Sequence, residues 1–275
     1  MLLDLACFDC LIEQVDKKGV KTFDGTSIPT PFEQVNNNGI YSFTCLKGHK
    51  AKTVIDNINF EILFEYGLNA IADGYYRESV SSLTSAMERY FEFFIKTILR
   101  SSKIDFDLID KSWKKISNQS ERQLGAYIML YLQAFGEEPL LLNPNSEIPF
   151  RNKVIHKGYI PTKTESIKFG NSVMKIIEES LLKLKSKYLN ECFETFDHYG
   201  YKKKAKEDIK KIEKDTGIEQ NTVFVNIMTT IDVKNGREKK SDDGRKGLVE
   251  LRIPNIIKRR KPRSLVLLKD KLKRK

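Results

Sequence analysis

Apolar side chains recur every three or four positions through the middle of the chain, which is the spacing of one buried face of an α-helix. The clearest stripe begins at Tyr76 and ends near Ser101. Because aromatic residues at helical spacing usually pack in a core, we interpret this stripe as core rather than as a base-stacking surface. The order of the stripes favours an up-and-down antiparallel helical bundle. The other stripes cover residues 57–72, 106–116, 119–135 and 161–190.

The two ends of the chain show strand-like alternation of apolar and polar residues. The best example is Asn221–Val233, where β-branched residues occupy every second position, and 248–253 is its expected partner in a β-hairpin. Shorter strand-like pieces lie at 20–23 and 39–44. We therefore predict a mainly α protein with a small β-rich N-terminal domain (1–55), a helical bundle (56–192) and a basic α/β C-terminal extension (193–275).

Charge separates the last quarter of the chain from the rest. The net charge is +11, and residues 201–275 hold 24 Lys and Arg against 11 Asp and Glu, a net of +13, so the first 200 residues carry −2. Such asymmetry favours a nucleic-acid-facing tail on a near-neutral body. A solvated basic tail without a specific partner is the alternative. The expected phosphate-binding residues of the tail are Lys258, Arg259, Arg260, Lys261 and Arg263.

The same sequence argues against several classes of protein. It has no apolar run of about 18 residues, so we expect no membrane span. The N-terminus lacks a basic region and has an early Asp4, which argues against a signal peptide. Its four cysteines without a secretory signal favour a reducing compartment, and hence a cytoplasmic location, over a disulfide framework.

Four residues near the N-terminus have the spacing of metal ligands. Cys7 and Cys10 form a CxxC pair, and Cys45 and His49 form a CxxxH pair with Gly48 inside it. Together they predict a tetrahedral structural Zn²⁺ site in a zinc-ribbon-like domain, which a segment of this size with few large apolar groups needs in order to fold. Free thiols beside an incidental histidine, or a catalytic Cys–His pair, are the alternatives.

Arg151 and His156 combine two functional groups close together in the sequence, after a proline-rich loop. A guanidinium binds phosphate and an imidazole transfers protons near neutral pH, so the pair is suited to cutting a phosphodiester bond without a metal. His156 is a candidate base or acid, and Asn152 a candidate for orienting it. One copy supplies one imidazole, so two copies at a symmetric interface would complete the set.

The segment Arg151–Pro161 (RNKVIHKGYIP) resembles the Arg-x4-His signature of the HEPN superfamily, and Gly67–Leu99 (GLNAIADGYYRESVSSLTSAMERYFEFFIKTIL) resembles its first long helix pair. Together with residues 150–184 the resemblance spans most of 57–190. It implies a homodimeric endoribonuclease with the motif at a helix start, Arg151, Asn152 and His156 as site residues, and products ending in a 2′,3′-cyclic phosphate. It also implies a role as a toxin or abortive-infection effector in anti-phage defence, with an antitoxin or regulatory partner.

The position of Tyr159 and the lysines beside the motif add to this comparison with HEPN proteins. Tyr159 lies three positions after His156, whereas HEPN toxins paired with a nucleotidyltransferase have a tyrosine two positions after it, so control by tyrosine nucleotidylation is not implied. Lys153 and Lys157 flank the motif and are expected to contact RNA. The alternatives to an enzyme are a non-catalytic HEPN scaffold, with Arg151 in a structural role, and an RNA-binding or regulatory module. Glu78, Glu88 and Glu92 are interpreted as solvated helix charges rather than as groups facing the motif.

Overall fold

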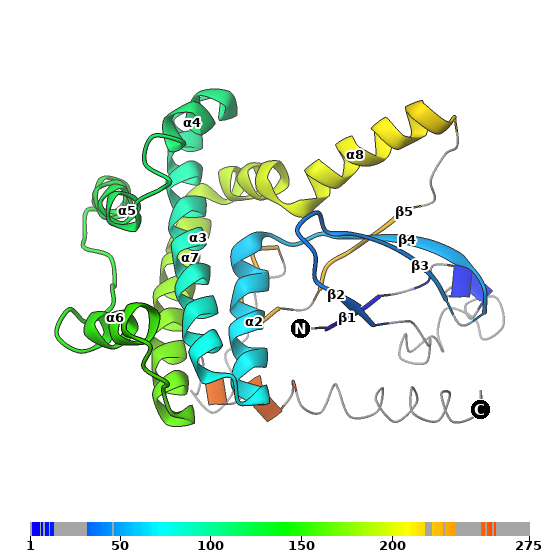
Figure 1. Ribbon diagram of the computed structural model, residues 1–275. Coiled ribbons are helices and arrows are strands. Elements are labelled where there is room, and N and C mark those ends of the chain that lie inside the picture. The colour runs from blue at the N-terminus through cyan, green and yellow to red at the C-terminus, as the bar shows by residue number, and fades with distance from the viewer. Residues whose placement is uncertain are drawn as a thin grey trace. The chain divides into compact units, whose positions relative to one another are not determined.

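The structure is a computed structural model, and it is mainly helical with a small three-stranded sheet (Figure 1). It divides into two compact units, one of residues Met1–Ile58 and Phe196–Met228 and one of residues Asn59–Thr195 and Thr229–Lys275. The described residues are 2–5, 7, 9–10, 12–13, 32–45, 47–217, 222–227, 229–234, 249–250, 252–254 and 256. The predicted strand 20–23 and the basic residues Lys258, Arg259, Arg260, Lys261 and Arg263 lie outside this range.

The helical unit begins with a hairpin of two antiparallel helices, α2 (Asn59–Asp73) and α3 (Tyr76–Ser101). Gly74 lies between them with φ +83°, in the left-handed region that favours glycine. Where the helices approach, a Cβ on Gly67 would come within 2.6 Å of the Leu83 side chain, so this close packing requires glycine. The predicted aromatic stripe is confirmed as core, because every member from Val80 to Ile98 is buried.

Helix α5 (Ser120–Phe135) packs on α3 through aromatic rings: Phe91 stacks on Tyr127 with centroids 4.1 Å apart. The hydroxyls of Tyr90 and Tyr127 both donate to the hydroxyl of Ser180 on α7 (Lys163–Tyr199), at 2.6 and 3.0 Å. These buried bonds join three helices at one point. Gly136, in the left-handed conformation, ends α5 where the sequence predicted its end.

Helix directions agree only in part with an up-and-down antiparallel bundle. α3 and α7 run in the same direction, because contacts between them occur in the same order along both helices. Figure 1 views α5 nearly along its axis while α3 and α7 are seen from the side, so α5 crosses α3 steeply instead of lying antiparallel to it. Phe and Tyr rings of both helices pack together where they cross. The spacing of apolar residues in the sequence shows which face of a helix is buried but not the angle at which two helices cross. The contacts that give the order are Tyr76–Ser166, Tyr90–Ser180 and Arg100–Glu194.

Two short helices complete this unit. α4 (Phe106–Trp113) is attached to α3 by the buried Lys96, which lies 2.8 Å from Glu92 of its own helix and 3.4 Å from Asp110. α6 (Glu147–Lys157) ends at Gly158, whose φ is +69°. α7 then starts with a capping box: the Thr162 hydroxyl accepts from the Glu165 N–H at 3.2 Å, and the Glu165 carboxylate accepts from the Thr162 N–H at 2.8 Å. Near its far end α7 has non-helical backbone at Tyr188.

The other unit is built on two small sheets. β1 (Leu2–Asp4) pairs with β2 (Phe32–Gln34), and β3 (Ile40–Thr44) forms an antiparallel hairpin with β4 (Lys50–Ile55). β5 (Thr222–Val225) adds to β4 in parallel. Helix α8 (Tyr201–Thr216) covers this sheet, and its Ala205 and Ile209 pack on Val54.

Asn57 joins the distant segments of this unit. Its side-chain amide donates to the carbonyl of Ile227 at 3.2 Å and accepts from the N–H of Ile227 at 2.8 Å. Its backbone carbonyl accepts from the N–H of Tyr201 at 3.1 Å. One buried residue therefore fixes the end of β4 to the exit of β5, through its side chain, and to the start of α8, through its backbone.

The C-terminal prediction is wrong in two respects. The strand expected over Asn221–Val233 is extended only over Thr222–Val225, and it pairs with β4 instead of with 248–253, where the described residues are helical. Past the strand, buried carboxylates of α2 bind the backbone, with Glu61 accepting from the N–H of Val233 at 2.7 Å and Glu65 from the N–H of Thr230. The division into three domains stays a prediction, and in the structure residues 196–228 share a compact unit with the N-terminal segment.

Among the described residues, no helix combines the length and apolar character that crossing a membrane requires.

Candidate functional site

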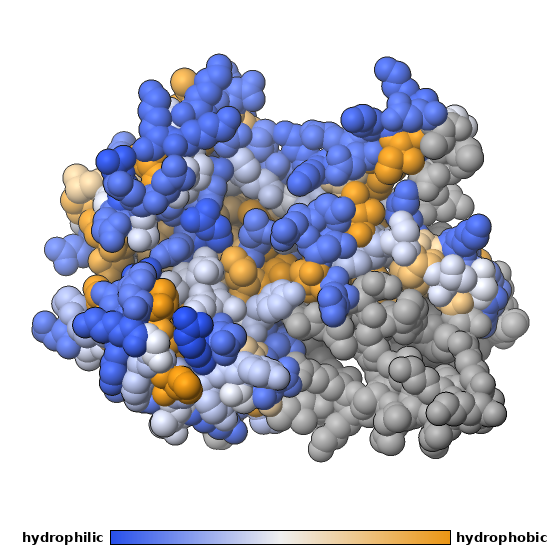
Figure 2. All heavy atoms as spheres, in the orientation of Figure 1, coloured by the Kyte–Doolittle hydropathy of each residue, from blue (hydrophilic) through white to orange (hydrophobic). Residues whose placement is uncertain are grey.

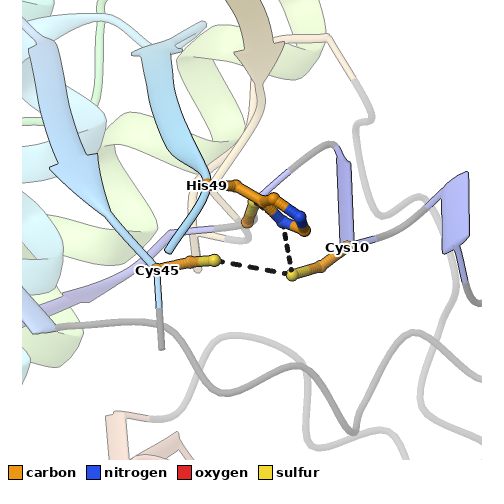
Figure 3. Close-up of side chains that lie close together, drawn as sticks. Cys10, Cys45 and His49 are labelled. Carbon is orange, nitrogen blue, oxygen red and sulfur yellow. Dashed lines mark hydrogen bonds between the residues drawn. The ribbon is translucent and has the colours of Figure 1, made fainter. Parts of the chain in front are cut away.

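The four predicted metal ligands converge in one place. The ligand atoms of Cys7, Cys10, Cys45 and His49 all lie within 4.8 Å of one another, and the three thiols are buried. Figure 3 shows three of these side chains, those of Cys10, Cys45 and His49, meeting at one point. The Cys10 and Cys45 sulfurs are 3.6 Å apart, and Nδ1 of His49 lies 3.4 Å from Cys10 and 3.8 Å from Cys7. These residues could therefore bind a metal ion.

The distances between the ligand atoms fit tetrahedral coordination of a metal ion. Around Zn²⁺ with ordinary bond lengths, two ligand sulfurs lie about 3.8 Å apart, and a sulfur and a histidine nitrogen about 3.6 Å apart. The three measured separations fall within a few tenths of an ångström of these values. Three thiols and one imidazole are the donors that zinc prefers for closed, structural sites.

Local backbone geometry explains why the second ligand pair is presented. Cys45 follows β3 and His49 precedes β4, so the pair lies in the turn of a hairpin. The Cys45 N–H donates to the His49 carbonyl and the Gly48 N–H donates to the Cys45 carbonyl, each at 2.9 Å. Gly48 has φ +89°, which a side chain would strain. The CxxxH spacing is therefore a tight turn that points both ligands the same way.

An acidic residue that the sequence did not single out supports the histidine. Nε2 of His49 lies 3.2 Å from a Glu13 carboxylate oxygen, which favours the tautomer with its proton on Nε2 and leaves the Nδ1 lone pair toward the sulfurs. Lys47 lies 2.5 Å from the other oxygen of the same carboxylate. No spacing rule marks Glu13, because such second contacts are set by the folded arrangement alone.

The thiols differ in acidity. Burial, followed by hydrogen bonds to Cys45 and Cys7, raises the pKa of the Cys10 thiol to about 12. For Cys45 burial also acts to raise the pKa, but backbone hydrogen bonds from Lys47 and His49 and bonds with the neighbouring thiols outweigh it and lower the pKa. Thiolates held this close repel one another, so a bound cation would be needed to displace all their protons.

The Arg151–His156 motif lies on α6, a short helix separate from α7. Arg151 comes four residues after the first residue of α6, and not at the helix start that the family resemblance implies. Pro149 lies in the first turn of α6, where a missing N–H is tolerated, so the predicted irregular segment ends earlier than expected.

Arg151 is held from two sides. One guanidinium nitrogen lies 2.9 Å from a Glu88 carboxylate oxygen on α3, and another donates to the Asn152 side-chain oxygen at 3.0 Å. The Arg151 and Glu88 side chains are 21% and 26% exposed. Glu88 is thus a contact of the motif, which corrects its interpretation as a solvated charge. Glu92 is likewise paired, with Arg89 and Lys96, whereas Glu78 is exposed, with Arg77 at 3.9 Å.

His156 is exposed, and its ring makes no hydrogen bond within the part of the chain that the structure describes. Five residues along a helix correspond to a rotation of about 140°, so Arg151 and His156 do not share a face. Asn152 lies four residues before His156 and does share its face. Asn152 therefore links the arginine, through a direct hydrogen bond, to the helix face that carries the imidazole.

Of the residues around the motif, Lys153 and Tyr159 make side-chain contacts, whereas Lys157 is exposed to solvent. The Lys153 ammonium lies 3.6 Å from the centre of the Tyr159 ring, and the Tyr159 hydroxyl donates to Glu165 at 3.0 Å. This hydrogen bond raises the pKa of Tyr159. Tyr159 is thus held by local contacts, while Lys157 is exposed. The structure brings Arg151 and Asn152 together with Glu88, and the metal ligands with Glu13.

In comparisons with protein-family models, curated proteins and solved structures, nothing matches this chain.

Proposed function

We propose that this protein is a metal-independent endoribonuclease of the HEPN type that cuts RNA at a composite site of two copies. The observation that carries the proposal is the arrangement on α6, where Arg151 is fixed by Glu88 and Asn152 while His156 stays exposed. A guanidinium has five N–H donors, and the two contacts leave others for a phosphate. The resemblance of 151–161 and 67–99 to HEPN proteins supports the same proposal.

The reaction would need no metal and no water. A base takes the proton of the RNA 2′-hydroxyl, the 2′-oxygen bonds to phosphorus, and the bond from phosphorus to the 5′-oxygen breaks as an acid protonates that oxygen. The products are a 2′,3′-cyclic phosphate and a 5′-hydroxyl. His156 would act as the base or the acid, and Arg151 would stabilise the charge on the phosphorane oxygens.

A second copy would complete the acid–base pair. The chain has three histidines: His49 belongs to the cysteine–histidine cluster, and His198 contacts Lys203 at 3.0 Å, which leaves His156. His156 of one copy and His156 of another would then serve as base and acid, which is why we propose a symmetric homodimer. Lys157 and Lys153 flank the motif and would attract the RNA backbone.

We also propose that the cysteine–histidine cluster holds a structural Zn²⁺ in a ribbon-like domain. Its four donors fill a tetrahedral shell and leave no open position for substrate, so the ion would stabilise the fold and take no part in cleavage. A cytoplasmic toxin or anti-phage effector, controlled by an antitoxin or regulatory partner, is the setting that we propose for such an enzyme.

One observation favours a second candidate, a non-catalytic scaffold. The Arg151–Glu88 ion pair joins α6 to α3, and a carboxylate at 2.9 Å offsets part of the charge that a phosphate would need. In that case Arg151 fixes the position of α6, and the bundle presents a surface for RNA or protein.

The test is RNA cleavage by the full-length protein in the presence of EDTA, followed by analysis of the product ends. We expect 2′,3′-cyclic phosphates, and a loss of about 10²- to 10⁴-fold in His156→Ala and about 10²- to 10³-fold in Arg151→Ala. Thermal melting must accompany the assay because EDTA also removes structural metal.

Matched controls separate chemistry from folding. His198→Ala removes a histidine outside the motif, and Arg100→Ala removes an arginine that makes a comparable ion pair, 2.7 Å from Glu194. Both should retain activity. Cleavage that survives in His156→Ala, or an active species that light scattering finds to be a monomer, would contradict the composite site.

A further inference from the structure

One flank of α8 carries lysines at regular spacing beside β5. Lys202, Lys206, Lys210 and Lys214 follow one another at intervals of four residues, so each lies about 6 Å along the helix and about 40° around it from the last. Lys203 lies on the same side. We call these five residues the lysine flank. The flank includes one acidic residue, Glu213, which lies between Lys202 and Lys206 around the helix. The opposite side of α8 carries Lys204 and Lys211 among three acidic residues, Glu207, Asp208 and Asp215.

An exposed aromatic ring adjoins the lysine flank. Phe224 on β5 is 37% exposed, although most large apolar residues of the sheet are buried. The ammonium groups of Lys202 and Lys206 lie 5.3 and 5.4 Å from its ring centre, within range of a cation–π contact. β5 is the outer strand of its sheet, so the ring stands at an edge. In Figure 2, hydrophilic side chains cover much of α8, and apolar surface lies directly beside them.

Charge and burial restrict what this surface fits. Lys202 is partly neutralised by Asp56, 3.6 Å away, but Lys206, Lys210 and Lys214 are exposed. The apolar face of α8, with Ala205 and Ile209, is buried against the sheet. A helix that binds membranes inserts its apolar face, so α8 does not suit that role.

We propose that the lysine flank and Phe224 form a binding site for single-stranded RNA. An exposed aromatic ring beside a line of cations combines the two features of such sites, a platform on which a base stacks and charges that follow the phosphates. A paired base in a duplex has no free face to offer the ring, so the site selects unpaired segments. The choice of RNA over DNA rests on the proposed ribonuclease function, but the site uses no residue of α6.

The experiment compares two double variants with the same change in charge. Lys206→Glu with Lys210→Glu reverses the lysine flank, and Lys204→Glu with Lys211→Glu reverses the opposite side of the same helix. Each is made in the full-length protein carrying His156→Ala, so that RNA is not cut, and binding of a fluorescent 12-nucleotide oligouridylate is measured against salt. The basic residues 258–275 are identical in both variants, so their contribution cancels.

We expect the flank variant to bind at least about 10-fold more weakly than the opposite-side variant, and its salt slope to fall by about 1.4, which corresponds to two lost phosphate contacts. Phe224→Ala should weaken binding by about 5- to 100-fold. Phe224→Tyr should restore binding, whereas Phe224→Leu, which keeps the apolar contact without an aromatic face, should not.

Equal losses of RNA affinity in the two double variants would overturn the proposed site. It would also be overturned if duplex RNA bound as tightly as the single strand, or if the protein bound vesicles of anionic lipid and not RNA. The outcomes for the two proposals are separable. If the wild-type protein cuts no RNA but the flank variants differ as expected, the nuclease proposal fails and this site stands. If cleavage needs His156 but the flank variants bind alike, the reverse holds.

Discussion

The cysteine–histidine cluster draws its ligand atoms from segments 35 to 42 residues apart into a space of 4.8 Å, whereas α6 spreads a motif of six consecutive residues around a helix. The cluster brings four possible metal ligands together within one copy. The α6 motif has one exposed imidazole and a paired arginine, so the chemistry that we propose for it would depend on a second molecule. Closeness in sequence is therefore a poor guide to a complete site, and long-range convergence is a better one.

The largest expected effect lies in the cluster. Cys45→Ser, or metal removal, should destabilise the N-terminal unit severely, because a structural zinc contributes about 10 kcal/mol or more of apparent folding free energy. The expected result is loss of bound zinc and of the cooperative melting of this unit. Metal content and circular dichroism measure it. Cys192→Ala, which changes a buried thiol outside the cluster, should keep its zinc. A Cys45→Ser protein that melts like the wild type would exclude a structural metal.

Glu88 offers the sharpest test of the α6 side of the comparison. Glu88→Ala leaves the partly buried Arg151 without its carboxylate, and a displaced guanidinium should lower kcat by about 10- to 100-fold. Glu88→Gln keeps an acceptor and should lose less. Single-turnover cleavage and thermal melting separate the candidates: a scaffold would lose stability in Glu88→Ala while its RNA affinity stays the same.

A smaller effect is expected at Glu13. Glu13→Gln removes the negative charge that contacts Nε2 of His49. Loss of a contact that orients a ligating histidine typically lowers metal affinity by about 10- to 100-fold. Competition with a chromophoric chelator measures the change. If the zinc affinity is unaltered, the carboxylate has no part in orienting the ring.

The smallest effect concerns the capping box that starts α7. Thr162→Ala should cost about 1 kcal/mol of stability. Hydrogen bonds from the backbone N–H and then the hydroxyl of Thr162 lower the pKa of Glu165, so this carboxylate stabilises the fold at neutral pH. That contribution is lost as the pH falls through the lowered pKa. Melting of Glu165→Gln should therefore differ from wild type at pH 7 and converge with it as the pH falls below the lowered pKa of Glu165. A constant difference across this range would contradict the assignment.

Local patterns predicted the parts of the fold that depend on local physics. The stripe from Tyr76 to Ser101 became α3, Gly136 ended α5, and CxxC and CxxxH spacing marked four residues that do lie together. The helix, its end and the turn that presents Cys45 and His49 are decided locally, by burial of one helix face, by a left-handed backbone position and by a tight turn. The meeting of the two ligand pairs depends instead on contacts between distant segments.

The sequence did not predict which strands pair or which helices contact each other, because these features depend on residues that are far apart in the chain. The alternation in Asn221–Val233 indicates a strand but carries no information on its neighbour, and β4 is more than 160 residues earlier in the chain. Glu88 resembles any solvated helix charge until α3 and α6 are packed together. The separate helix α6 was missed because Pro149 suggests a loop, although a first helical turn accepts proline.

The pairing of β4 with β5 has a consequence for folding during synthesis, because the ribosome produces the two strands far apart in time. Asn57 binds Ile227, 170 residues later, so every helix from α2 to α8 emerges before the third strand of the sheet exists. At about 5 to 20 residues per second this delay lasts roughly 10 to 30 s. During that time the hairpin of β3 and β4 is complete but its outer edge has no strand to pair with. An ion that binds early would therefore meet an unfinished sheet, and a chaperone or a second nascent chain has that interval in which to reach the open edge.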